Sequence, residues 1–143
     1  MSVKKGERNT EEVDSKTGFF NTYFKMYDDA INLIDNNFGA RDSIFVRKMS
    51  DKVFDIINDI GTHISIANAI YPKDKDYKKE YEERRIHQEI AIGLCFDLLN
   101  KYKISAKKLK AKGNEYVNET KNINHEINCL KKWRTSDNHR FSG

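Results

Sequence analysis

Residues 45–70 read FVRKMSDKVFDIINDIGTHISIANAI, and their apolar positions recur at steps of three and four. This row comprises Phe45, Met49, Val53, Ile56, Ile57, Ile60, Ile64, Ala67 and Ile70. Such spacing places side chains on one face of an α-helix, so the segment predicts a long amphipathic helix. Asp42 or Ser43 can cap its start, and Tyr71-Pro72 is expected to stop it.

The segments on either side of this helix repeat the same spacing. The earlier row, which Gly39 is expected to end, comprises Phe20, Tyr23, Phe24, Tyr27, Ile31, Ile34 and Phe38. The later row comprises Tyr77, Tyr81, Arg84, Gln88, Ala91, Cys95, Leu98 and Tyr102, and a second row beside it holds Ile86, Ile90 and Leu94. Buried polar groups are costly unless they are paired. We therefore expect Arg84 and Gln88 to lie at a subunit interface or at a bundle end.

A fourth helix is predicted from a cap at Ser105 to about Trp133. Its buried row comprises Leu109, Tyr116, Thr120, Ile123, Ile127 and Leu130. Four helices joined by short loops predict an all-α protein, an up-and-down antiparallel four-helix bundle. The bundle is expected to span residues 18–135, after a flexible polar tail over 1–17 and before a C-terminal tail over 136–143.

Composition limits the possible architectures. The chain has 143 residues with one proline and seven glycines, which suits a single domain of long helices better than a sandwich or barrel. Glycine inside a helix costs about 1 kcal/mol relative to alanine, so we expect close helix packing at Gly93 to account for its presence. The chain has no apolar run of membrane-spanning length, which predicts a cytoplasmic protein. Cys95 and Cys129 are expected to be small buried apolar residues, with no disulfide between them.

Charge is distributed unevenly along the chain. Residues 1–100 hold 15 Lys and Arg against 18 Asp and Glu, a balance of −3, whereas residues 101–143 hold 11 against 4, a balance of +7. The net charge is +4. A basic last helix favours a surface for a polyanion, although an ordinary solvated lysine-rich face gives the same pattern.

Basic residues gather at both ends of the predicted fourth helix. The candidate binding residues are Lys107, Lys108, Lys110, Lys112, Lys121, Lys131, Lys132, Arg134 and Arg140. Such side chains neutralise phosphates and release counterions. Lys107, Lys110 and Lys121 are predicted to share one face of that helix. Trp133 is expected to pack at the bundle end and not to stack on bases.

Motifs of catalysis are weak in this chain. There is no P-loop, no G-x-G-x-x-G, no H-E-x-x-H and no G-x-S-x-G. Bundle enzymes with two metals use Glu-x-x-His, whereas Glu83 here lies four residues before His87. We therefore expect a protein that is not an enzyme and has no cofactor or metal, and a di-metal bundle enzyme is the least favoured alternative.

Four short motifs, taken in order, resemble a known family. They are Lys5-Gly6-Glu7-Arg8, Asp51-Lys52, Ala67-Asn68-Ala69 and Trp133-x-x-Ser136-Asp137-x-x-Arg140. With the four-helix layout, they resemble the accessory variability determinant proteins of diversity-generating retroelements. That bundle is shared with proteins encoded in intervening sequences of bacterial 23S ribosomal RNA genes.

The resemblance implies a non-catalytic accessory subunit that assembles as a homo-oligomeric ring, typically a pentamer. Such a subunit binds a reverse transcriptase together with its RNA or cDNA and supports mutagenic cDNA synthesis. The net charge of +4 is lower than in strongly basic members, which raises the weight of the protein partner. The alternative is a bundle protein of the ribosomal intervening-sequence type with another RNA-binding or protein-binding role.

Overall fold

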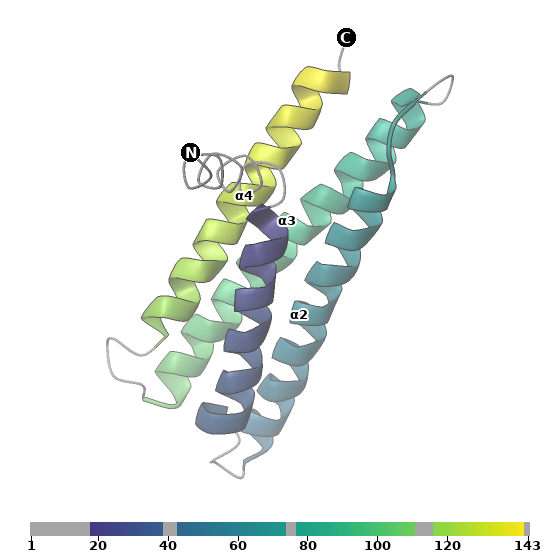
Figure 1. Ribbon diagram of the computed structural model, residues 1–143. Helices are drawn as coiled ribbons and strands as arrows, with labels where there is room; N and C mark the ends of the chain where they lie inside the picture. Colours follow the sequence, from purple (N-terminus) through teal and green to yellow (C-terminus); the bar gives the residue numbers. More distant parts are fainter. Residues whose placement is uncertain (1–17, 39–42, 74–76, 111–115, 142–143) are drawn as a thin grey trace, which may run out of the picture.

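The computed structural model describes residues 18–38, 43–73, 77–110 and 116–141, and these ranges are helical apart from short connections (Figure 1). The first helix is α-helical over residues 18–32 and continues as the π-helix η1, Leu33–Phe38. The others are α2, Ile44–Ala69; α3, Tyr77–Lys108; and α4, Val117–Phe141. No strand occurs within these ranges. The all-α prediction is confirmed, while the predicted tail over residues 1–17 lies outside the described residues.

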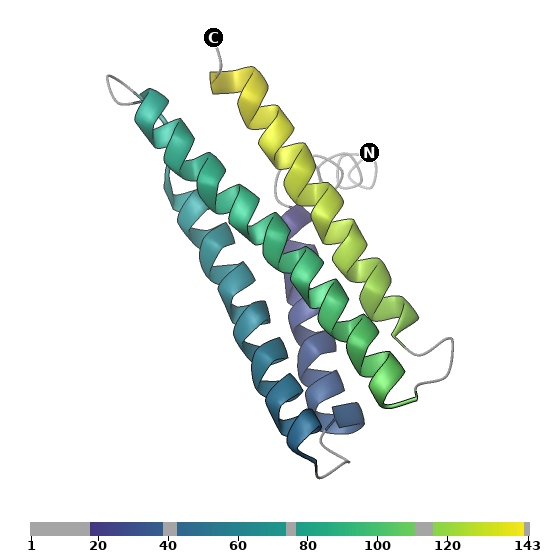
Figure 2. The same cartoon turned by 180° about the vertical axis from the view of Figure 1, so that it is seen from behind.

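The four helices pack side by side with alternating direction (Figures 1 and 2). α3 packs against both α2 and α4, and η1 packs against α2. The first helix also meets α4, because Phe19 stacks on Trp133 and the Asn122 amide donates to Asp29 at 2.7 Å. In both of these contacts, a residue early in one helix meets a residue late in the other helix. The arrangement is the predicted up-and-down antiparallel bundle.

Helix α2 follows its sequence pattern closely. Its buried residues are Val46, Met49, Val53, Ile56, Ile57, Ile60, Ile64 and Ala67. The Ser43 hydroxyl accepts from the Val46 backbone N–H at 3.1 Å, which identifies Ser43 as the N-cap. The helix ends at Ala69, three residues before Pro72, as predicted.

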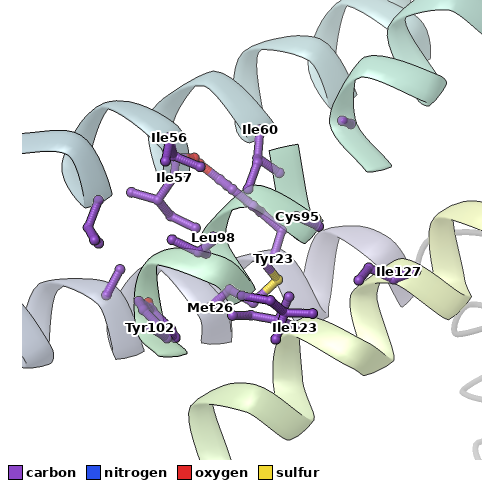
Figure 3. Close-up of a cluster of buried hydrophobic side chains, with 14 of the residues drawn as sticks. Tyr23, Met26, Ile56, Ile57, Ile60, Cys95, Leu98, Tyr102, Ile123 and Ile127 are labelled. Atoms are coloured by element: carbon purple, nitrogen blue, oxygen red, sulfur yellow. The ribbon is translucent and has the colours of Figure 1, made fainter. Parts of the chain in front are cut away.

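All four helices contribute side chains to one continuous core (Figure 3). The labelled members are Tyr23, Met26, Ile56, Ile57, Ile60, Cys95, Leu98, Tyr102, Ile123 and Ile127. Burial of apolar surface contributes roughly 25 cal/mol per Å², so this shared interior is the main stabilising element of the bundle.

The first helix uses a different face from the predicted one. Its buried apolar residues are Phe19, Tyr23, Met26, Ala30 and Leu33, whereas Phe24 is 60% exposed. Two apolar rows overlap at helical spacing in this segment, and periodicity alone does not choose between them. Contact with α2 and α4 decides which of the two rows is buried. Phe38, the last member of the predicted row, belongs to η1, and its side chain lies outside the described residues.

The boundary between the third and fourth helices was predicted wrongly. Ser105 does not cap a fourth helix; it is buried inside α3, which continues to Lys108. Ser105 extends the buried row by three residues from Tyr102, and its small side chain fits that seam. Helix α4 begins only at Val117 and continues to Phe141, beyond the predicted boundary at residue 135.

The glycine expected to permit close packing is also a different one. A Cβ added to Gly93 would meet nothing within 4 Å, so tight packing does not explain this residue. A Cβ on Gly61 would lie 2.3 Å from the Tyr23 hydroxyl oxygen. That hydroxyl donates to the Ile57 carbonyl at 2.8 Å. Gly61 therefore creates the space in which the first helix and α2 approach each other.

Both cysteines are free thiols. Cys95 is buried, as expected, and its burial raises the pKa of the thiol. Cys129 is only half-buried and lies beside His125. None of the described helices combines the length and the apolar character required to cross a bilayer.

Candidate nucleic-acid interface

Helix α4 has one buried face and one basic face. The buried residues are Ile123, Glu126, Ile127, Leu130, Trp133 and Asp137. The exposed positions include Lys121, His125, Asn128, Lys131, Lys132, Thr135, Ser136, His139 and Arg140. Arg134 is half-buried between the two sets. Between Thr120 and Phe141, no exposed residue of α4 is acidic. We call the exposed cations Lys121, Lys131, Lys132 and Arg140 the α4 basic face.

Glu126, one of the two carboxylates in this stretch, lies inside the core. It is 0% exposed, and neither carboxyl oxygen has a hydrogen-bond partner among the described residues. Burial disfavours the ionised form and raises the pKa of Glu126 to about 9. The side chain is therefore protonated at neutral pH and adds no negative charge to α4.

Asp137, the other carboxylate, is paired inside the chain. Arg84 donates to it through Nε at 2.7 Å and through Nη2 at 3.1 Å, and the Gln88 amide donates to it at 2.6 Å. A third guanidinium donor, Nη1, reaches the Ile70 carbonyl at 3.0 Å. These residues lie at the end of the bundle where α3 begins and α4 ends, which we call the polar bundle end. The pairing within one chain means that Arg84 and Gln88 do not require a subunit interface.

Aromatic rings accompany two of the exposed cations. The Lys131 ammonium lies 5.6 Å from the ring centre of Phe96 on α3. Arg140 donates to the Tyr71 hydroxyl at 2.8 Å and lies over the rings of Tyr71 and Phe141. Phe96 and Tyr71 are half exposed, so part of each ring is accessible to a ligand. Cations beside accessible rings suit a polyanion whose bases can stack.

Trp133 does not belong to this accessible set. It is 7% exposed and stacks on Phe19 with ring centres 4.2 Å apart. The Arg84 guanidinium covers its ring at 5.0 Å. Trp133 is therefore buried against the first helix and Arg84.

Two hollows border the basic face. The larger, of about 610 Å³, is lined by His125, Asn128, Cys129, Lys131, Lys132, Thr135, Ser136 and His139. The smaller, of about 310 Å³, lies where α3 ends and α4 begins, and Lys103 and Lys121 line it beside Tyr102 and Tyr116. Lys103 was not predicted as a site residue because its place beside Lys121 depends on how two separate helices pack.

The structure places the predicted lysines on different elements. Lys107 and Lys108 are exposed in the last turn of α3, and Lys110 follows that helix with a φ of 53°. Lys112 lies outside the described residues. Lys121 is on α4, whereas Lys107 and Lys110 are not, so the predicted single-helix face shared by Lys107, Lys110 and Lys121 is wrong. The break near residue 110 separates them.

A histidine pair joins α2 to α3 on another side of the bundle. The Nδ1 atoms of His63 and His87 are 2.8 Å apart, so one ring donates to the other. His63 therefore lies at a helix interface, where its partner is another histidine. The described residues contain no group of three or more His, Cys, Asp or Glu side chains able to hold a metal ion.

The chain matches no protein-family model, no curated protein and no solved structure. Its function is therefore inferred from its own residues and from the physical chemistry of its surface.

Proposed function

We propose that this protein is a non-catalytic binding subunit whose α4 basic face holds RNA or single-stranded cDNA. The observation that carries the proposal is the separation of charge on α4. Its exposed surface carries Lys121, Lys131, Lys132 and Arg140, while Glu126 is buried and Asp137 is paired with Arg84. Between Thr120 and Phe141 the exposed charges of α4 have one sign only, and such a surface attracts a polyanion even when the net charge of the chain is small.

The length of this face suits several phosphates. Lys121 and Arg140 are separated by 19 residues, or about 28 Å along a helix that rises 1.5 Å per residue. That distance corresponds to about eight steps of a nucleic-acid strand at 3.4 Å each. The half-exposed rings of Phe96 and Tyr71 provide stacking surfaces beside two of these cations.

The resemblance to accessory variability determinant proteins supports a more specific form of the proposal. In that form, the protein partner is a reverse transcriptase, which performs the chemistry while this subunit holds RNA or cDNA. A gene for a reverse transcriptase beside this gene, and co-purification of the two proteins, are the expected observations. A neighbouring ribosomal RNA intervening sequence would favour the alternative role instead.

The test is a salt titration of RNA binding with a matched control. Lys121→Gln, Lys131→Gln and Lys132→Gln together remove three charges from the basic face. The slope of log K against log salt for single-stranded RNA should decrease in magnitude by about 2, since each lost phosphate contact contributes about 0.7.

The control removes three exposed charges elsewhere on the bundle, through Lys25→Gln, Lys48→Gln and Lys52→Gln. Its net charge equals that of the test variant, and its salt slope should match that of wild type. An equal decrease of the salt slope in both variants would show that RNA binding depends only on the net charge of the chain. Absence of wild-type binding at low salt would refute the proposal outright.

A further inference from the structure

The outward face of α3 carries an apolar row that no described helix covers. In Figure 2, α3 crosses the side of the molecule turned to the viewer, between α2 and α4. Ile86, Ile90 and Ile104 on this helix are 51%, 38% and 37% exposed. Ile86 and Ile90 belong to the second apolar row of the sequence and are not part of the core, whereas Leu94, the third member of that row, packs partly against it. The row therefore needs an explanation other than the packing of this bundle.

The spacing of this row is that of a helix-pairing seam. Ile86, Ile90, Gly93, Asp97, Asn100 and Ile104 follow one another at alternating steps of four and three. This heptad spacing places the six positions on one face of α3, with isoleucines towards its two ends and Gly93, Asp97 and Asn100 between them. Gly93 lies within the row, and the space around its missing Cβ is open. A glycine at such a position lets a second helix approach closely, at the known cost in helix propensity.

Exposed charges of opposite sign lie near the two ends of this face. Glu82 and Glu83 are exposed near the start of α3, and Lys107 and Lys108 are exposed in its last turn. None of these four has an ion-pair partner among the described residues. A parallel copy of α3 would set like charges against each other. An antiparallel copy would set Glu82 and Glu83 against Lys107 and Lys108.

We propose that two copies of this chain dock through their α3 helices in an antiparallel, two-fold symmetric pair. With the axis at the level of residue 95, Ile86 of one copy faces Ile104 of the other. In the same register Glu82 and Glu83 lie at the level of Lys107 and Lys108 of the second copy. Each contact occurs twice, as an isologous interface requires. The partner is a second copy of the chain, because the same α3 face, turned end to end, presents lysines where the first copy presents glutamates.

This pairing goes beyond the proposed nucleic-acid role and does not depend on it. A two-fold interface closes at two subunits and does not build a ring of five. The α4 basic face is not part of the seam, so a dimer presents two such faces. Two linked faces would strengthen the binding of a polyanion that spans both.

The experiment uses complementary charge reversals in the full chain, measured by sedimentation or light scattering. One variant combines Glu82→Lys with Glu83→Lys, and the other combines Lys107→Glu with Lys108→Glu. Wild type should have twice the chain mass of 16.8 kDa at micromolar concentration. Each variant alone should shift to 16.8 kDa, because like charges then face each other. An equimolar mixture should return to twice that mass, because opposite charges meet at both ends of a mixed pair.

The matched control, Asp51→Lys with Asp55→Lys, places the same charge change on exposed positions of α2 and should remain dimeric. Far-UV circular dichroism establishes that each variant is folded, and the mixing step shows directly that each can dock. A monomeric wild type, a fivefold mass, or a mixture that stays monomeric would overturn the proposal. Because the readout is mass, its failure is distinct from a failure of RNA binding.

Discussion

The Arg84 guanidinium and the Asp137 carboxylate form a buried two-point ion pair, with Nε to Oδ2 at 2.7 Å and Nη2 to Oδ1 at 3.1 Å. The pair joins the start of α3 to the end of α4, and Arg84 also reaches the Ile70 carbonyl at the end of α2. It therefore holds three helices together at the polar bundle end. It also neutralises Asp137, one of the acidic groups that would otherwise weaken the basic character of α4.

Removal of one partner from this ion pair should destabilise the bundle strongly. Asp137→Ala leaves a buried guanidinium with no counter-charge, and such losses cost about 3–5 kcal/mol. Urea denaturation at neutral pH measures the change. Arg85→Ala is the control, because it breaks the exposed pair between Arg85 and Glu89 and should cost about 0.5 kcal/mol or less. Similar losses of unfolding free energy in both variants would show that the buried ion pair contributes no more to stability than the exposed one.

Glu126 should make the bundle less stable as pH rises. Its pKa is about 9 in the folded chain against an ordinary value of 4.5, so between these values the folded state binds more protons than the unfolded state. The stability therefore declines by up to about 1.4 kcal/mol per pH unit across this window. Glu126→Gln should remove this decline, so its advantage over wild type should be larger at pH 8 than at pH 5. A constant difference at the two pH values would mean that Glu126 is ionised in the folded protein.

Gly61→Ala should destabilise the bundle even though alanine is the better helix former. The new Cβ would lie 2.3 Å from the Tyr23 hydroxyl oxygen and 2.6 Å from the ring carbon that bears it. Overpacking of this kind costs about 1–3 kcal/mol. In a Tyr23→Phe background the ring is released from the Ile57 carbonyl, and the cost of Gly61→Ala should decrease. Thermal unfolding of the four proteins forms a double-mutant cycle, and strict additivity would contradict the contact.

Trp133→Ala should affect stability and leave the basic face intact. The substitution removes the stack on Phe19 and the ring that Arg84 covers, and aromatic truncations in cores cost about 3–5 kcal/mol. Chemical denaturation measures the loss. At a temperature where the variant remains folded, RNA affinity should equal that of wild type. A large loss of affinity in the folded variant would mean that Trp133 contacts the nucleic acid.

Much of the fold could be predicted from the apolar periodicity alone. Helix α2 begins at its Ser43 cap and buries the predicted row, because consecutive steps of three and four define a single stripe there. The prediction was wrong where the sequence permits two solutions. Phe19 and Phe20 begin two overlapping rows in the first helix, and only the positions of α2 and α4 select the row that is buried.

The candidate site depended on tertiary structure to a greater degree. The sequence by itself determined an all-helical chain with its positive charge concentrated near the C-terminal end. The packing decided that Glu126 enters the core and that Asp137 meets Arg84, residues separated by 53 positions. Helical periodicity specifies which residues share a face of one helix, but it contains no information about which faces of different helices meet. The burial of Glu126 and the pairing of Asp137 leave only basic charges exposed between Thr120 and Phe141, and both arise only from that meeting.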